Sequence, residues 1–156
     1  MIDVPSLANN FHDEHCRLLA RSFESLLRAP LIGVESDDVD LSQKLWNCDA
    51  VVLSHGTEED PIFNYGNQLA QKLFEVTWSE LTEMPSRLSA ELPNREERAR
   101  LLAEVSSKGY IQDYSGVRIS KSGRRFLVSN ATVWNLLDHD GNFAGQAATF
   151  TDYKFL

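Results

Sequence analysis

Three extended runs follow one another in the last third of the chain, at residues 110–119, 124–137 and 143–150. The connections between them, residues 120–123 and 138–142, are rich in Ser, Gly, Asp and Asn. These residues accept positive φ or bond to their own backbone, as short hairpin turns require. The pattern therefore predicts an antiparallel meander of three strands, on which the rest of the chain packs.

The middle run is largely apolar on both of its alternating sets of residues. One set is Phe126, Val128, Asn130, Thr132, Trp134 and Leu136, and the other is Leu127, Ser129, Ala131, Val133, Asn135 and Leu137. A half-exposed antiparallel strand would show one polar set, so this strand needs cover on both faces. We expect the helices in the middle of the chain to cover one face. An amphipathic helix over residues 11–28, or a second copy of the protein, would cover the other.

The segments before the meander alternate between helical and extended patterns. The helix over residues 11–28 carries one apolar stripe, with Asn10 as its cap, and a short helix follows at residues 41–47. Short strands at residues 50–54 and 61–67 precede several short helices and a longer one over residues 95–107, which Asn94 caps. This order predicts an α+β fold, a five-stranded antiparallel sheet with short helices on one face. We divide the chain into an N-terminal helical extension, residues 1–48, and a domain, residues 49–156.

Composition and charge restrict the partners. The chain has 156 residues, 42% of them hydrophobic, and a formal net charge of −8, which is enough for one core. Residues 1–60 hold 12 Asp and Glu against 4 Lys and Arg, and no basic stripe with interleaved aromatic residues occurs, so we expect no nucleic-acid partner. No run reaches the roughly 18 apolar residues of a membrane helix. The first ten residues also lack the basic start of a secretion signal, so we expect a cytoplasmic protein without a membrane partner.

Short strings spread over most of the chain resemble a known family. They are Ser54-His55-Gly56-Thr57, Asp60-Pro61-Ile62-Phe63-Asn64-Tyr65-Gly66-Asn67, Pro85-Ser86-Arg87-Leu88-Ser89-Ala90, Asn94-Arg95-Glu96-Glu97-Arg98, Gly109-Tyr110-Ile111 and Asn130-Ala131-Thr132-Val133-Trp134-Asn135. Together with the order of the elements, they resemble the MEKHLA domain, a PAS-like domain, in its standalone single-domain form. The resemblance implies sensing and protein interaction without enzymatic activity.

The resemblance also bears on partners. The same domain forms the C-terminal region of certain plant homeodomain-leucine zipper factors, but this chain has no homeodomain helix or basic zipper, so DNA binding does not carry over. Few residues follow the last strand, and we therefore expect any signal to leave through contact with another chain, an unknown signalling protein. We also expect a homodimer through the N-terminal helix, with Phe11, Leu19, Phe23 and Leu26 at the interface.

A small-molecule ligand of such a domain would lie between the sheet and the short helices, in an apolar pocket with a few polar anchors. The resemblance makes Asn130 and Gln146 candidates, because flavin-binding PAS relatives anchor the ring with amides on these last strands. The other candidates are Thr132, Trp134, His55 and Tyr114. Each also has a structural explanation: amides can bond to backbone or face solvent, His55 can hold a turn, and Trp134 can belong to the core or an apolar interface.

The sequence does not name the ligand, but it disfavours some cofactors. Haem needs an axial His, Cys or Met, and the middle helices, residues 67–109, contain only Met84 of these types. A covalent flavin would need a cysteine in the same region, and Cys16 and Cys48 lie outside it. His12 and His15 are three residues apart, but no third ligand follows with helical spacing, so we expect no metal.

Two other classes of function stay open. A polar cluster of Asp113, Tyr114 and Arg118 could serve a small cone-shaped α+β enzyme of the hydratase or isomerase type. In that case the helix over residues 11–28 would cap the open end of the cone, whereas in a PAS-like domain it would lie across the outer face of the sheet. The third possibility is a pure dimerisation module with a filled core and no pocket.

Overall fold

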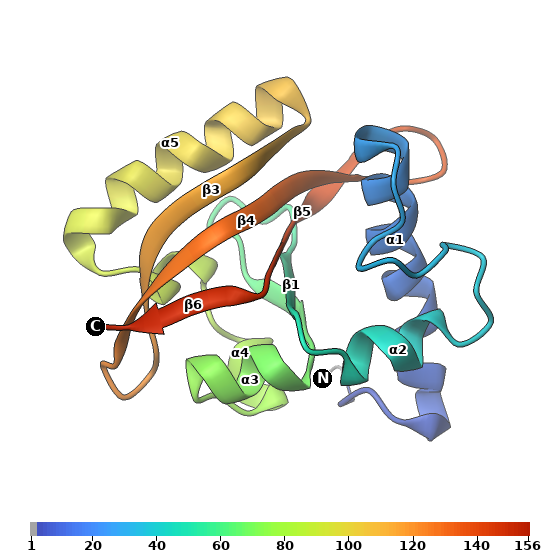
Figure 1. Ribbon diagram of the computed structural model, residues 1–156, viewed down its shortest axis with the longest axis horizontal. Coiled ribbons are helices and arrows are strands. Elements are labelled where there is room, and N and C mark those ends of the chain that lie inside the picture. The colour runs from blue at the N-terminus through green and yellow to red at the C-terminus, as the bar shows by residue number, and fades with distance from the viewer. Residues whose placement is uncertain (1–2) are drawn as a thin grey trace.

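A computed structural model describes residues 3–156, except for the side chains of residues 92–94. Within these residues, a curved antiparallel sheet of six strands has the order β2-β1-β5-β4-β3, and β6 pairs with β4 (Figure 1). The strands are β1 Val51–His55, β2 Phe63–Gly66, β3 Tyr110–Ile119, β4 Arg125–Leu137, β5 Phe143–Phe150 and β6 Asp152–Phe155. The five expected strands are all present. β6 was not expected, and it continues the line of β5 along β4.

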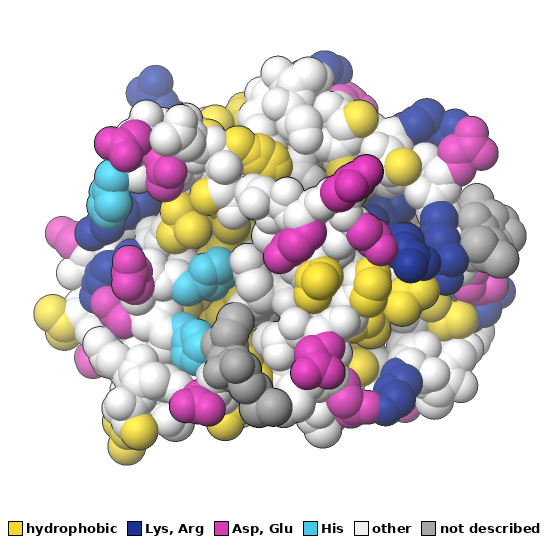
Figure 2. Space-filling view, turned by 180° about the vertical axis from the view of Figure 1, so that it is seen from behind, with side chains coloured by type: hydrophobic (Ala, Val, Ile, Leu, Met, Phe, Trp, Pro, Cys, Tyr) yellow, Lys and Arg dark blue, Asp and Glu magenta, His cyan; other side chains and the backbone are white. Residues whose placement is uncertain are grey.

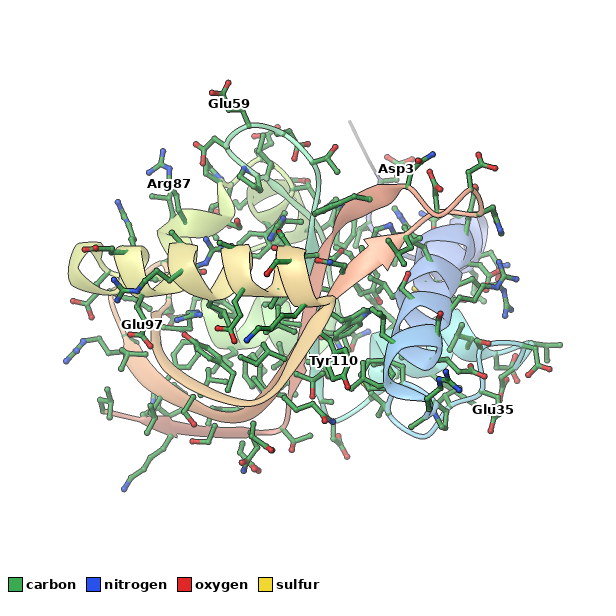
Figure 3. All side chains as sticks on the ribbon, turned by 90° about the horizontal axis from the view of Figure 1, so that it is seen from above. Asp3, Glu35, Glu59, Arg87, Glu97 and Tyr110 are labelled. Atoms are coloured by element: carbon green, nitrogen blue, oxygen red, sulfur yellow. The ribbon has the colours of Figure 1, made fainter. Side chains whose placement is uncertain are left out.

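Helices lie on both sides of the sheet. They are α1 Asp13–Leu27, α2 Leu41–Asn47, α3 Gln68–Phe74, α4 Trp78–Leu81 and α5 Leu92–Lys108, with short 3₁₀ segments η1 Leu7–His12 and η2 Ser86–Ser89. Seen from above, α5 runs along β3 on one side of the molecule, and α1 lies on the opposite side (Figure 3). We call the side of the sheet that faces α3 and α5 the inner face, and the side that faces α1 the outer face.

The structure corrects two helix boundaries. α1 begins at Asp13 rather than Phe11, because residues 10–12 all have positive φ, between 52° and 56°, which an α-helix does not accommodate. Asn10 is therefore not its cap. α5 begins at Leu92, before the expected start, so Asn94 lies within the helix and not at its cap position. The Asn94 side chain is outside the described residues.

α1 packs across the outer face of the sheet. Leu19 is 0% exposed and shares a buried cluster with Leu45 of α2 and Trp134 of β4. The indole Nε1 of Trp134 donates to the Leu19 carbonyl oxygen at 3.2 Å, and the ring of Phe23 meets the Trp134 ring edge-on with centroids 5.0 Å apart. One chain therefore covers both faces of the central strand. The helix lies where a PAS-like domain would place it, while a domain boundary at residue 48 stays a prediction.

Two bulges decide which side chains of the long strands face the inner helices. Asn130 of β4 and Asp113 of β3 have φ values of 55° and 57°, in the left-handed region that Asn and Asp tolerate, and the β3–β4 pairing is irregular around both. A one-residue bulge moves the side chains that follow it to the opposite face. Phe126 and Val133 therefore both pack on the inner side, whereas Trp134 faces α1. The strict alternation used in the sequence analysis holds only as far as Asn130.

Candidate functional site

A cavity of about 70 Å³ lies between the inner face of the sheet and helices α3 and α5. Most of its wall is apolar and comes from both layers, with Leu53, Phe63 and Val133 on the strands and Phe74 and Leu101 on the helices. Its polar side chains are those of His55, Ser89, Arg98, Tyr114, Arg118 and Gln146. Ser54 also lines the cavity, but its hydroxyl is bonded to His15 and Asn64. Concave, mostly apolar sites with a few converging polar groups are the usual form of small-molecule pockets.

His55 and Gln146 of the cavity wall belong to a row of cross-strand neighbours. His55 of β1 pairs with Gln146 of β5, which pairs with Asn135 of β4. The Gln146 Nε2 donates to the Asn135 Oδ1 at 3.1 Å and to the Leu102 carbonyl oxygen at 3.0 Å. The Asn135 Nδ2 in turn donates to the Val105 carbonyl oxygen at 3.0 Å. These bonds tie α5 to two central strands and fix Gln146 at the cavity wall.

His55 carries an unsatisfied nitrogen in the same row. The residue is 7% exposed, and its Nδ1 lies 3.1 Å from the Gly56 carbonyl oxygen, so the proton of the neutral ring belongs on Nδ1. The Nε2 atom is then an acceptor, and within the described residues it is buried without a hydrogen-bond partner. Burial lowers the pKa of His55 from 6.5, which keeps the ring neutral at pH 7. A group that donates to Nε2 would remove the free-energy cost of leaving this acceptor unpaired.

Two arginines line the cavity beside Tyr114. The Arg98 Nη2 donates to the Ser86 Oγ at 2.7 Å, and the Arg118 Nη2 donates to the Tyr114 hydroxyl at 3.3 Å. Within the described residues, neither guanidinium forms an ion pair with a carboxylate. Burial, and then the charge of Arg118, lowers the pKa of Arg98 to about 10, so the Arg98 side chain stays charged at pH 7. Figure 2 shows Lys and Arg side chains gathered beside hydrophobic ones at the end of the molecule where α5 begins.

Three of the six ligand candidates from the sequence line this cavity, namely His55, Tyr114 and Gln146. The other three do not. Asn130 is exposed on the bulge, where its amide donates to the Asp152 carboxylate at 2.8 Å. Thr132 and Trp134 follow the bulge on the outer face. The expected pocket role of these three residues is therefore corrected, and the physical reason is the bulge, which reverses the faces of β4.

Arg98 is the cavity residue that the sequence analysis did not single out. It lies three, four and seven residues before Leu101, Leu102 and Val105, which pack toward the sheet. Positions at this spacing share one face of a helix, so the sequence did hold a signal: a cation at the head of an apolar stripe. Arg118 entered only as part of an enzyme-like cluster with Asp113, and Asp113 is exposed and does not line the cavity.

The four residues expected at a dimer interface lie on η1 and α1. Leu19 is fully buried inside the single chain, so it has no surface to offer a partner. Phe11, Phe23 and Leu26 are partly buried against the same cluster. The chain's own sheet therefore takes up most of the stripe that the sequence analysis assigned to a second copy.

A second polar cluster lies under α1. The His15 Nε2 is 2.8 Å from the Ser54 Oγ, and Ser54 donates to the Asn64 Oδ1 at 2.5 Å. Because a serine has one hydroxyl proton, His15 donates to Ser54 here and does not accept from it. This direction is opposite to the one that activates a serine nucleophile. Burial, and then the charge of His12, lowers the pKa of His15 to about 4.

The two cysteines lie away from the cavity wall. Cys16 and Cys48 are free thiols, and burial raises the pKa of Cys16 to about 12, which makes it a poor nucleophile. Among the residues that the structure describes, no three His, Cys, Asp or Glu side chains are grouped so that they could hold a metal ion. In residues 3–156, no helix combines the length and the apolar character needed to cross a membrane.

Comparison with known sequences assigns nearly the whole chain to one family. The family model of the MEKHLA domain matches residues 13–155. The homeobox-leucine zipper protein ATHB-14 of Arabidopsis thaliana is 27% identical over 144 residues, which are 90% of this chain. The homeobox-leucine zipper protein HOX10 of Oryza sativa subsp. indica is 23% identical over 141 residues. The matched region is 17% of the length of each plant protein.

Solved structures with a similar fold are PAS and light-oxygen-voltage domains. The PAS domain of a Colwellia psychrerythraea protein has a TM-score of 0.62 over 74% of this chain and 92% of that one, at 9% identity. A light-oxygen-voltage domain studied with a flavin analogue has a TM-score of 0.60 over 76% and 86% of the two chains, at 15% identity. The light-state dimer of the fungal photoreceptor Vivid has a TM-score of 0.53 over 66% and 77%, at 13% identity. The chain belongs to the MEKHLA domain family and has a PAS-like fold.

Proposed function

We propose that the protein is a non-enzymatic sensory module that binds a small molecule in the inner cavity and passes the signal to another protein by contact. The observation that carries the proposal is the buried, unpartnered Nε2 of His55, beside Gln146 in the cavity wall. Buried acceptors normally have a donor, so a ligand or water that supplies one would complete the site. Membership of a PAS-like family supports the sensory role. The cytoplasmic location stays a prediction.

The size of the cavity restricts the ligand. A volume of about 70 Å³ is well below the several hundred Å³ of a pocket for a drug-sized molecule. An engineered cavity of about 150 Å³ binds benzene, which has six non-hydrogen atoms, so the cavity of this protein accepts only a very small molecule unless its walls move. A flavin or a haem would fit only if the sheet and α5 moved apart. We therefore propose that the protein senses a small metabolite.

Native mass spectrometry of the purified protein, paired with its absorbance spectrum, tests the proposal. We expect a retained small molecule, or a rise in melting temperature when small metabolites are added. A His55→Leu variant keeps an apolar side chain but removes the acceptor, and it should lower the stabilisation. If the protein retains no molecule and no small molecule stabilises it, the claim that the cavity binds a ligand is wrong. The protein would then be an interaction module.

We also infer a homodimer as the assembly in which the module acts. Support comes from the accessible remainder of the N-terminal stripe, Phe11, Phe23 and Leu26, and from the Vivid structure, which is a dimer of that protein. The native mass spectrum should show twice the chain mass at micromolar concentration, and Leu26→Asp should shift it to the monomer. A monomeric wild-type protein would overturn the dimer and leave the ligand proposal intact.

A further inference from the structure

We propose that the cavity binds a short-chain hydroxycarboxylate, with its carboxylate on Arg98 and Arg118 and its hydroxyl donating to the Nε2 of His55. This inference rests on the proposed function and names the chemical class of the ligand. It follows from the hydrogen-bonding capacity that the cavity leaves unused, from the charges around it and from its volume.

The two arginines have most of their donors free. A guanidinium has five N–H donors. Within the described residues, Arg98 uses one group, on Ser86, and Arg118 uses two, on Tyr114 and the Val117 carbonyl oxygen. A carboxylate matches the planar fork of an arginine and accepts charge-assisted hydrogen bonds from it. Arg98 and Arg118 also repel each other, which an anion between them would relieve.

The charge of Asp60 acts on Arg98 and that of Glu58 acts on His55, but both carboxylates have other bonding partners. Asp60 forms an ion pair with Arg87 at 3.2 Å, and the Glu58 Oε1 accepts from the Ile62 backbone at 3.2 Å. In Figure 3, Arg87 stands beside the β1–β2 loop, which carries Glu59. The chain has a net charge of −8, yet Arg98 and Arg118 at the cavity form no ion pair with a carboxylate among the described residues. An anionic ligand would supply the missing partner.

His55 distinguishes a hydroxycarboxylate from a plain carboxylate. Its Nδ1 is committed to the Gly56 carbonyl oxygen, and its neutral Nε2 can only accept. A carboxylate has no proton to donate at pH 7, so in the proposed complex a second group of the ligand supplies it. A hydroxyl is the smallest such group, and three- and four-carbon hydroxy acids are among the smallest molecules that carry both groups, as a cavity of about 70 Å³ requires. Its short carbon chain would contact Leu101 and Val133.

The cavity borders a hollow on the surface at the same wall. His55, Leu102 and Gln146 line both the cavity and a hollow on the surface, whose other side is formed by the β1–β2 loop and Phe143. These three side chains therefore separate the buried volume from solvent.

Isothermal titration calorimetry of the full chain tests the class, with lactate and 3-hydroxybutyrate as probes. Propionate lacks the hydroxyl, and lactamide lacks the charge, so these two compounds are matched controls. We expect a hydroxycarboxylate to bind at least roughly ten-fold more tightly than lactamide, because hydrogen bonds to charged groups are the stronger ones. Propionate should fall between them.

Variants assign the contacts. Arg98→Gln and Arg118→Gln should each weaken lactate binding roughly ten-fold or more, whereas Arg87→Gln, which removes a surface arginine paired with Asp60, should not change it. Arg98→Lys is the second variant at that position, since it keeps the charge if loss of the Ser86 bond disturbs folding. His55→Leu should abolish the preference for lactate over propionate while propionate still binds. Circular dichroism reports whether each variant is folded.

The results of these experiments distinguish a failure of the carboxylate site from a failure of the sensory role. Equal binding of lactate and lactamide, or binding that Arg98→Gln and Arg118→Gln leave unchanged, would overturn the carboxylate site. A neutral molecule retained in the native mass spectrum would do the same while confirming a sensor. If no probe binds and no molecule is retained, both proposals fall together.

Discussion

Acid should weaken the docking of α1 on the sheet, because the side chain of His15 on this helix is held neutral where it contacts Ser54 of the sheet. Its Nε2 donates to Ser54, and its ring lies 5.7 Å from that of Tyr65. Protonation would place a positive charge in this partly buried site, close to His12. Burial is the larger of the two effects that lower the pKa of His15 to about 4, compared with 6.5 in an exposed histidine.

The direction of the effect follows from proton binding. Between pH 6.5 and pH 4 the unfolded chain carries a proton on His15 that the folded chain lacks, so the free energy of unfolding falls as the pH is lowered through this window. The full difference between pKa values of 6.5 and about 4 corresponds to about 3.5 kcal/mol, because one pKa unit is worth about 1.4 kcal/mol. Most of this stability should be lost by pH 4.5. The loss is a large part of the roughly 5–15 kcal/mol that stabilises a typical domain.

Urea unfolding at pH 7.5 and pH 4.5, for the wild type and for His15→Gln, measures the effect. Glutamine can still donate to Ser54, but it does not titrate. Other groups also reduce stability in acid, such as Asp38 and Glu75, whose pKa values are lowered in the folded protein. The difference between wild type and variant therefore isolates the effect of His15. The wild type should lose about 2–3 kcal/mol more than the variant between the two pH values. Equal losses in the two proteins would refute the idea that a neutral His15 is required under α1.

Three other substitutions test the packing. Asn67→Ala should cost about 3 kcal/mol or more in urea unfolding, because this fully buried side chain accepts from backbone N–H groups of β1 and α3 and donates to the carbonyl oxygens of Leu45 and Ala50. Gly145→Ala should cost more than Gly141→Ala, since an added Cβ at position 145 would lie 2.2 Å from a backbone oxygen of β1 and one at position 141 would meet nothing within 4 Å; equal melting temperatures would contradict this. Leu19→Asp should abolish folding by circular dichroism, whereas a folded monomer would show that this residue serves an interface and not the core.

The fold could be predicted from the sequence largely because its signals are local. The turns at residues 120–123 and 138–142 and the apolar periods of the strands depend on neighbouring residues only, and they appear in the structure as expected. The short run Asp152–Phe155 has little alternation of its own. It becomes β6 because β4 extends beyond its pairing with β5 and offers it free backbone groups.

The faces of β4 could not be predicted, because they depend on a bulge. Asn130 tolerates the left-handed region, but so do other Asn residues of this chain, and only the pairing with β3, which has its own irregularity at Asp113, makes this Asn the site of the bulge. An assignment by alternation is right before such a point and reversed after it. Thr132 and Trp134 were therefore expected in the pocket, and Asn135 was not considered.

The central strands bring the two polar sites of the protein close together on opposite faces of one layer. In the row that pairs Ser54 with Ala147 and Trp134, the side chains face α1, and the next row, with Gln146, faces the cavity. Successive residues of a strand share one backbone and point to opposite faces, so we expect a ligand that moves the backbone at Gln146 to move Ala147 beneath α1 as well. Because Gln146 is already bonded to α5, the same shift would be felt by both helices. We therefore expect a ligand in the cavity to affect the position of α1 more directly than that of the exposed strand β6.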